Sequence, residues 1–253
     1  MRPTLATAVL TLAALAGAAG PAYAAPDKAP PLAARLAACT TGAEDASRAA
    51  AFTGSMPATS TTRRMMMRFV LQQRVGPGPK GTFKKLAVPG WGGWEKSDPG
   101  REGFVFTKRV EGLTAPAAYR ASITFRWLDA KGRVLRTRTR TTTACEQPDP
   151  RPDLVLGAFS AAPVGTTTAA YTISVDNEGR TAADPFAVTV TVDGVTSDPM
   201  TLGPLAAGAR ATGSVAAPRC TPGSTVTVTL DVADTVEESV EGDDVVQRPC
   251  PLA

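Results

Sequence analysis

The stretch "YRASITFRWLDAKGRVLRTRTRTTTAC", residues 119–145, alternates apolar and polar residues on both sides of a short turn. A period of two is typical of a β-strand with one buried face. In the first arm, the odd positions from Tyr119 to Trp127 are apolar, and "DAKG" at 129–132 is suited to a turn. The stretch therefore predicts a β-hairpin whose first arm covers a hydrophobic core.

The second arm carries an arginine at every second position. Leu135 and Cys145 share a parity, so we expect odd positions to face the core and the arginines to face outward. The neighbouring arm and Lys84 and Lys85 would extend this patch. The candidate polyanion-binding face consists of Arg120, Arg126, Arg136, Arg138 and Arg140.

Three interpretations of these arginines stay open. A strand of alternating Arg and Thr is typical of a solvated edge that resists aggregation. The same residues could bind a polyanion, such as a cell-wall polymer, an acidic glycan or a nucleic acid. They could also dock against an acidic part of the same chain.

Other segments of the first half also predict strands of a β-sandwich. In "RRMMMRFVLQQR", residues 63–74, apolar residues alternate from Met65 to Leu71. In "GLTAPAAY", residues 112–119, a leucine is followed after five residues by a tyrosine that enters a strand. This spacing resembles the tyrosine corner of fibronectin type III and related immunoglobulin-like domains. The resemblance implies a seven-strand sandwich.

Two tryptophans lie in "PGWGGWEKSDPG", residues 89–100. Tryptophans of small sandwiches usually belong to the core, and we expect Trp94 to pack inward. Trp91 is left as a candidate platform for stacking against a sugar ring.

The first 24 residues predict a secretory signal peptide, with one arginine, a small-residue apolar run and the cleavage site "AYA". No second apolar run is long enough for a membrane span. "LAAC", residues 36–39, matches a lipidation box in letters. Charged residues and prolines separate it from the apolar run, so we do not expect a lipid on Cys39.

Four cysteines in an exported chain predict two disulfides. Pairing within each half would join Cys39 to Cys145 and Cys220 to Cys250. The chain has no histidine, which excludes Ser-His and Cys-His nucleophile pairs and the usual zinc sites. Carboxylate or Ser-Lys chemistry stays open, but no residue pattern marks it, so we expect no cofactor and no enzymatic activity.

The two halves carry opposite charge. Residues 39–147 contain 19 Lys and Arg against 8 Asp and Glu, a net charge of +11; residues 148–253 contain 5 against 14, a net charge of −9. Pro148, Pro150 and Pro152 predict a stiff linker over 148–152. The asymmetry predicts different partners for the halves, or a contact between them.

Five short motifs follow one another in the second half. They are "PDL" at 152–154, "VDNEG" at 175–179, "VDG" at 192–194, "LAAG" at 205–208 and "LDVADTVEESVEGDD" at 230–244. Their order resembles the bacterial cell-adhesion-related domain called CARDB. The resemblance implies an immunoglobulin-like sandwich in exported proteins that are regarded as adhesion or binding modules. It supplies no catalytic residues.

The last motif is strongly acidic. Asp231, Val236, Glu238 and Glu241 agree with the family pattern, but Asp243 and Asp244 stand where asparagines are common. Residues 237–244 are interpreted as a solvated turn, with a cation site as the alternative, because carboxylates can ligate Ca²⁺.

Together these features predict an all-β chain with two immunoglobulin-like β-sandwich domains in tandem. The expected order is a signal peptide (1–24), a lead-in (25–38), a basic sandwich (39–147), the linker (148–152) and an acidic CARDB-like sandwich (153–253). The predicted function is extracellular, non-enzymatic binding or adhesion at a bacterial envelope, with a cell-wall polymer or an envelope protein as partner. The alternative is a structural or accessory spacer of an envelope assembly.

Overall fold

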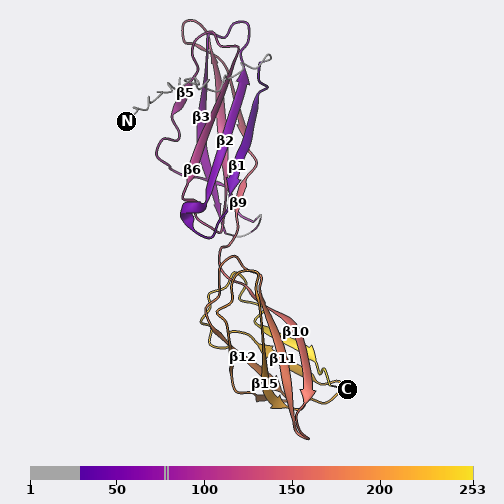
Figure 1. Ribbon diagram of the computed structural model, residues 1–253. Helices are drawn as coiled ribbons and strands as arrows, with labels where there is room; N and C mark the ends of the chain where they lie inside the picture. Colours follow the sequence, from indigo (N-terminus) through magenta and orange to yellow (C-terminus); the bar gives the residue numbers. More distant parts are fainter. Residues whose placement is uncertain (1–28, 77, 79, 253) are drawn as a thin grey trace, which may run out of the picture.

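The computed structural model describes residues 29–76, 78 and 80–252, so the expected signal peptide lies outside the described residues. Two β-sandwiches follow one another along the chain (Figure 1). This confirms the predicted all-β fold with two immunoglobulin-like domains. Within the described residues, no helix has the length and apolar character needed to cross a membrane.

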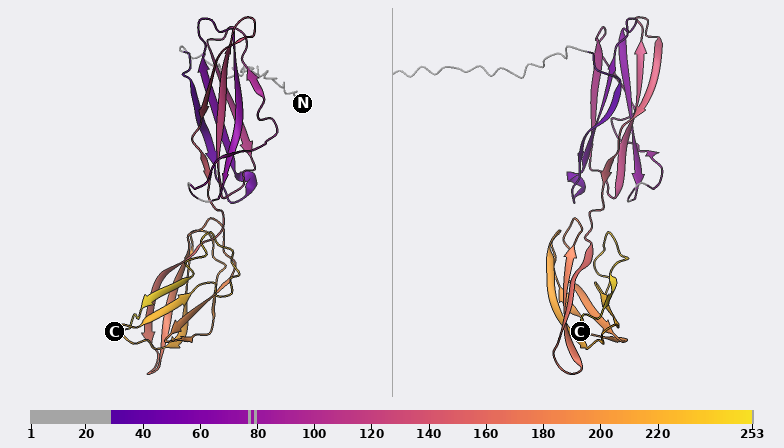
Figure 2. Two further views of the ribbon diagram at one scale, coloured as in Figure 1. Left: turned by 180° about the vertical axis from the view of Figure 1, so that it is seen from behind. Right: turned by 90° about the vertical axis from the view of Figure 1, so that its right-hand side faces the viewer.

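The first domain packs a three-stranded sheet against a six-stranded sheet (Figure 2, right). The three-stranded sheet has the order β1 (Ala33–Thr40), β2 (Ala49–Pro57), β6 (Gly103–Glu111). The six-stranded sheet has the order β4 (Lys84–Lys85), β3 (Arg64–Val75), β7 (Ala117–Leu128), β8 (Val134–Thr141), with β5 (Trp94–Lys96) beside β3 and β9 (Cys145–Gln147) beside β7.

The first domain differs from the prediction in two respects. Residues 33–38, which we expected in the lead-in, belong to β1 and pair with β2. Much of β1 is exposed at the edge of its sheet, so few of its positions need an apolar residue. For this reason the segment lacks the clear alternation that would predict a strand. The described residues also form nine strands instead of seven, since β4 and β5 add two short strands beside β3.

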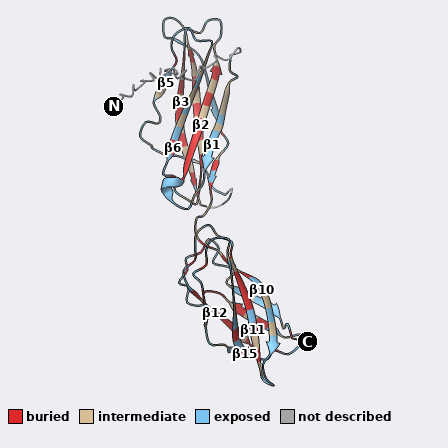
Figure 3. Cartoon of the chain, in the orientation of Figure 1, coloured by how far each residue is buried: buried red, intermediate tan, exposed pale blue. Residues whose placement is uncertain are grey.

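The core of the first domain follows the predicted alternation. The odd positions of β3 from Met65 to Leu71 and of β7 from Tyr119 to Trp127 are buried. The tyrosine corner is present, because the Tyr119 hydroxyl donates to the Thr114 carbonyl oxygen at 3.0 Å. Figure 3 shows buried residues in red along β2 and β3, and alternate residues of β7 are buried as well.

The second domain is also built from two sheets. One sheet has the order β10 (Leu154–Pro163), β11 (Thr168–Asn177), β15 (Arg210–Pro218). The other has the order β13 (Val195–Thr196), β12 (Phe186–Val192), β16 (Thr225–Thr229), β17 (Val245–Pro249), with β14 (Met200–Leu202) beside β12. Alternate residues of β11 and β12, such as Ile173 and Val190, fill the space between them.

Candidate functional site

A β-bulge in the predicted hairpin decides where the arginines lie. Val134 pairs with Leu128, but the next pair is Arg136 with Trp127, so Leu135 is an extra residue in β8. One extra residue exchanges the two faces of the strand that follows. Without the bulge, Leu135 would stand opposite Trp127 and the arginines would face outward, as we expected.

The five predicted arginines therefore do not form one face. Directly paired residues share a face of the sheet, and Arg136, Arg138 and Arg140 pair with the buried Trp127, Phe125 and Ile123. These three arginines, named here the edge stripe, lie on the inner side of the sheet. They stay exposed because β8 is an edge strand. Cys145 also does not share a strand with the arginines, because residues 142–144 separate β8 from β9, where Cys145 lies.

Arg120 and Arg126 lie on the opposite, outer face of the six-stranded sheet. Arg126 pairs with Met66 and Arg120 with Gln72, so both share the face of the even positions of β3. These positions include Arg64 and Arg68. Lys96 pairs with Met66 and Lys85 with Gln72, which adds two lysines to this face. We call it the outer face, made of Arg64, Arg68, Lys85, Lys96, Arg120 and Arg126.

The two tryptophans take the opposite places from those predicted. Trp91 packs edge-on against Phe52 and Phe69, with ring centroids 6.2 and 6.3 Å apart. It belongs to the border of the core and is half-buried, so only part of its ring is open to solvent. Trp94 pairs with Arg68 in β5 and lies on the outer face. Gly92 and Gly93 separate the two tryptophans, and Gly92 has a positive φ of 84°, which favours glycine.

Arginines stack on two aromatic rings of the outer face. The guanidinium carbons of Arg126 and Arg68 lie 4.3 and 5.1 Å from the centroid of the Trp94 ring. Those of Arg120 and Arg74 lie 3.9 and 5.0 Å from that of Phe83. We name these the tryptophan cluster (Arg68, Trp94, Arg126) and the phenylalanine cluster (Arg74, Phe83, Arg120). Stacking of this kind holds a guanidinium in place while its N–H groups stay available.

Neither arginine of the tryptophan cluster forms an ion pair within the described residues, and the same holds for Arg64 and Arg120. Arg74 does form one, with Glu146 at 3.1 Å. Sequence reasoning missed Arg68 as a partner of Trp94 and missed Phe83 altogether. One signal was available in the sequence: Arg64 and Arg68 occupy even positions of β3, which places them on the face opposite the buried odd positions.

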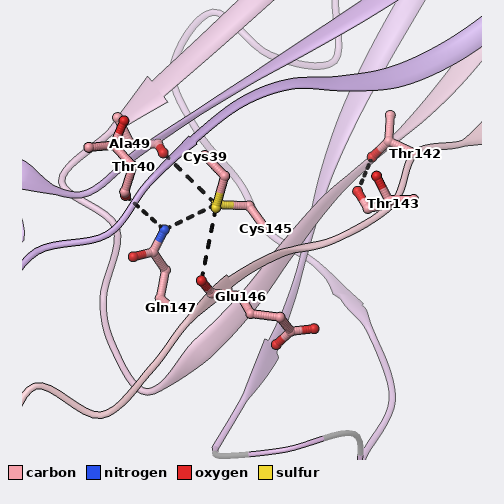
Figure 4. Close-up of a disulfide and its surroundings, with 8 residues drawn as sticks. All are labelled: Cys39, Thr40, Ala49, Thr142, Thr143, Cys145, Glu146 and Gln147. Carbon is pink, nitrogen blue, oxygen red and sulfur yellow. Dashed lines mark hydrogen bonds between the residues drawn. A yellow bond between two sulfur atoms is a disulfide. The ribbon is translucent and has the colours of Figure 1, made fainter. Parts of the chain in front are cut away.

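Both disulfides join the predicted cysteines. Cys39 to Cys145 ties β1 to β9 across the two sheets of the first domain (Figure 4). The Gln147 side-chain amide donates to the Thr40 carbonyl oxygen at 3.2 Å and lies beside the disulfide. Cys39 in this bond has no thiol available for lipidation.

The acidic motif of the second domain is partly buried. Glu238 is fully buried, and one of its carboxyl oxygens accepts a hydrogen bond from the Leu154 backbone amide. The expectation of a solvated turn is therefore wrong for Glu238. Burial raises the pKa of Glu238 to about 8, and the nearby Asp244 and Glu241 carboxylates act in the same direction. Burial likewise raises the pKa of Asp244 to about 6.

The same motif residues form a hydrogen-bonded network with the start of the domain. Asp231 accepts from the Val236 amide at 2.7 Å, and Glu241 accepts from the Glu238 amide at 2.6 Å. The Ser239 amide donates to the Pro152 carbonyl oxygen at 2.9 Å. In the part of the chain that the structure describes, no three acidic, cysteine or histidine side chains are arranged to hold a metal ion.

Asn177 of "VDNEG" connects its motif to two others. Its side-chain amide donates to the carbonyl oxygens of Thr181 at 2.8 Å and Leu205 at 2.9 Å. Its side-chain oxygen accepts from the amides of Asp153 at 3.2 Å and Gly179 at 3.0 Å. The motifs "PDL", "VDNEG" and "LAAG" thus meet around one buried asparagine, and their role is structural.

Comparison with known proteins agrees with this reading of the motifs. Residues 151–248 match the family model described as CARDB. The search of curated proteins gives no match.

Solved structures of other proteins are similar at low identity. The crystal structure of red sea bream transglutaminase is 8% identical, with a TM-score of 0.31, and covers 87% of this chain, which spans only 31% of that one. CBD12 from CALX1.2 is 10% identical over 78% of this chain and 79% of its own, with a TM-score of 0.27. The CsuC–CsuE chaperone–tip adhesion subunit complex of Acinetobacter baumannii is 11% identical, with a TM-score of 0.27. The match covers 84% of this chain and 96% of that one.

At these TM-scores the structural likeness carries no functional argument, and the family match stands alone. It covers residues 151–248, from the linker to β17, and all five motifs lie within this range. The C-terminal domain of this chain is therefore a CARDB domain.

Proposed function

We propose that this chain is a non-enzymatic binding protein of the extracellular space or bacterial envelope, and that its basic first domain binds an anionic polymer. The adhesion-related CARDB domain supports a binding role. Two disulfides are typical of an exported protein, because they persist in oxidising compartments.

The observation that carries this proposal is the outer face of the six-stranded sheet. Arg64, Arg68, Arg120 and Arg126 lie there without an ion-pair partner among the described residues. A surface of one sign attracts polymers of the opposite sign and accelerates their association. The edge stripe adds three more arginines in β8, on the inner side of the same sheet. The domain therefore has two separate basic surfaces that could bind an anionic polymer.

A retention experiment tests the proposal. The chain from Ala25 onward is passed over immobilised heparin, immobilised teichoic acid and neutral dextran at about 10 mM salt, where the screening length is about 30 Å. We expect retention on both polyanions, release as the salt concentration rises, and no retention on neutral dextran. Passage through both polyanion columns at low salt would contradict polyanion binding and favour the alternative, a structural spacer of an envelope assembly.

A further inference from the structure

We infer that the anionic ligand is a linear polymer that lies along β3 and β7 on the outer face and contacts the tryptophan cluster and the phenylalanine cluster together. This inference rests on the proposed function and names the site and the kind of ligand.

The tryptophan cluster presents two guanidinium groups to solvent from one aromatic ring. Arg68 and Arg126 both stack on Trp94, and the Nε atoms of both lie buried without a hydrogen-bond partner. The terminal nitrogens of a stacked guanidinium can donate side by side to one sulfate, phosphate or carboxylate group. Because the stacking already restricts both side chains, binding would cost less conformational entropy than for mobile arginines.

The phenylalanine cluster repeats this arrangement farther along the sheet. Arg120 lies closest to the Phe83 ring, and its Nε donates to Gln72 at 2.8 Å. This bond orients the guanidinium, and within the described residues its terminal nitrogens have no hydrogen-bond partner. Arg74 is compensated by Glu146, so Arg120 supplies the free positive charge of this cluster.

The distance between the clusters argues for a polymer rather than a small anion. Arg126 and Arg120 are six residues apart on β7, and a strand rises about 3.4 Å per residue, which separates them by about 20 Å. The intervening outward positions include Val70, Ser122 and Thr124, which are short and carry no negative charge. One extended ligand could lie over these residues and reach both clusters, whereas a single small anion could reach only one.

The edge stripe is a poorer site although it has three arginines of its own. Among the described residues, Arg138 and Arg140 have no aromatic stacking partner, and all residues of β8 are exposed. Only Arg136 lies over a ring, at 5.3 Å from the centroid of Trp127. Mobile arginines must be ordered on binding, which lowers the affinity gained per charge.

Two matched variants test the inference. One replaces Arg68, Arg120 and Arg126 with glutamine, and the other replaces Arg136, Arg138 and Arg140 with glutamine, so both remove three positive charges. We expect the first to lower affinity for dextran sulfate by about a hundredfold, because both clusters are lost, and the second to lower it much less. Arg-to-Lys replacement of the same outer-face residues keeps the charge and should give an intermediate loss, which a folding defect would not do.

Oligosaccharide length gives a second readout on the unaltered chain. Sulfated oligosaccharides that extend beyond about 20 Å should bind markedly more tightly than shorter ones, because they can reach both clusters at once. Equal losses in the two glutamine variants, or no gain in affinity beyond this length, would overturn the inference and leave the proposed function intact. Failure of the unaltered chain to bind any polyanion would instead overturn the proposed function.

Discussion

The two domains use their charged and polar residues in opposite ways. In the first domain, Arg68, Arg120 and Arg126 of the outer face stack on aromatic rings and form no ion pair among the described residues. In the second domain, Asn177 and Glu238 are buried in hydrogen bonds that hold the linker end together. The motifs that identify a family therefore report the architecture of the second domain, whereas the candidate binding surface lies in the first domain, outside the residues that the family model matches.

The two disulfides give the largest expected difference between the domains. Cys39 and Cys145 are 106 residues apart, and Cys220 and Cys250 are 30 apart. In the chain-entropy model, these loops correspond to about 4.8 and about 3.7 kcal/mol of stabilisation. We expect Cys39→Ala/Cys145→Ala to lower the free energy of unfolding of the first domain by the larger amount, measured by urea denaturation of the whole chain.

The corresponding Cys220→Ala/Cys250→Ala variant serves as the control for the second domain. A larger loss from the short loop than from the long loop would show that strain or residual structure, and not loop length, controls these disulfides.

The Asn177 network should be nearly as important for the second domain. Replacing Asn177 with Ala removes four hydrogen bonds and leaves buried carbonyl and amide groups without partners. We expect a loss of about 3 kcal/mol or more in the second domain's stability, measured by denaturation, with the first domain unchanged. The exposed neighbour supplies a control, since Glu178→Ala should have little effect. Equal effects of the two variants would refute a structural role for the motif.

Glu238 should make the second domain less stable as the pH rises. Its pKa is raised to about 8 in the folded domain, so the folded state holds a proton that the unfolded chain releases near pH 4.5. The stabilisation is complete below pH 4.5 and is lost as the pH rises through 8, at up to about 1.4 kcal/mol per pH unit. Asp244 also makes the second domain less stable as the pH rises, between its ordinary pKa of 3.8 and its folded-state pKa of about 6.

Thermal melts between pH 5 and 8 measure this dependence. Glu238→Gln keeps the oxygen that accepts from Leu154 but cannot ionise, so its melting temperature should change less with pH. Below pH 4 the opposite trend should appear, because Arg210 holds the pKa of Asp176 below its usual value. A melting temperature that rises from pH 5 to 8 in the unaltered chain would contradict this account of Glu238.

The smallest effect on stability should come from the edge stripe. Replacing Arg136, Arg138 and Arg140 with threonine should change the unfolding free energy by less than about 1 kcal/mol, since exposed charges contribute little. Denaturation of this variant beside the unaltered chain provides the measurement. A larger loss would mean that β8 depends on its arginines, for example on Arg136 over Trp127.

The fold was predictable because its signals are local. Alternation of residues such as Met65 and Phe69 marks the strands, the spacing before Tyr119 marks the tyrosine corner, and the cysteines pair within the halves. Each of these features depends on neighbours in the sequence or on the compartment that favours disulfides.

The candidate site was less predictable because it depends on register. One extra residue, Leu135, places the edge stripe on the inner instead of the outer side of the sheet. The residues around Leu135 give no sequence signal for this bulge. Trp94 lies on the outer face instead of the core because β5 pairs with β3, with Trp94 opposite Arg68. Hydrophobicity alone does not predict this pairing. The burial of Glu238 likewise depends on Leu154, which is 84 residues away.

The central claim is that the outer face binds a linear polyanion, and the most direct test is NMR titration of the isotope-labelled chain with a sulfated oligosaccharide. The account predicts shifts of the Trp94 indole signal and of residues around Arg68, Arg120 and Arg126, with the signals of β8 and the second domain little changed. Shifts concentrated on Arg136, Arg138 and Arg140, or no shifts at low salt, would contradict it.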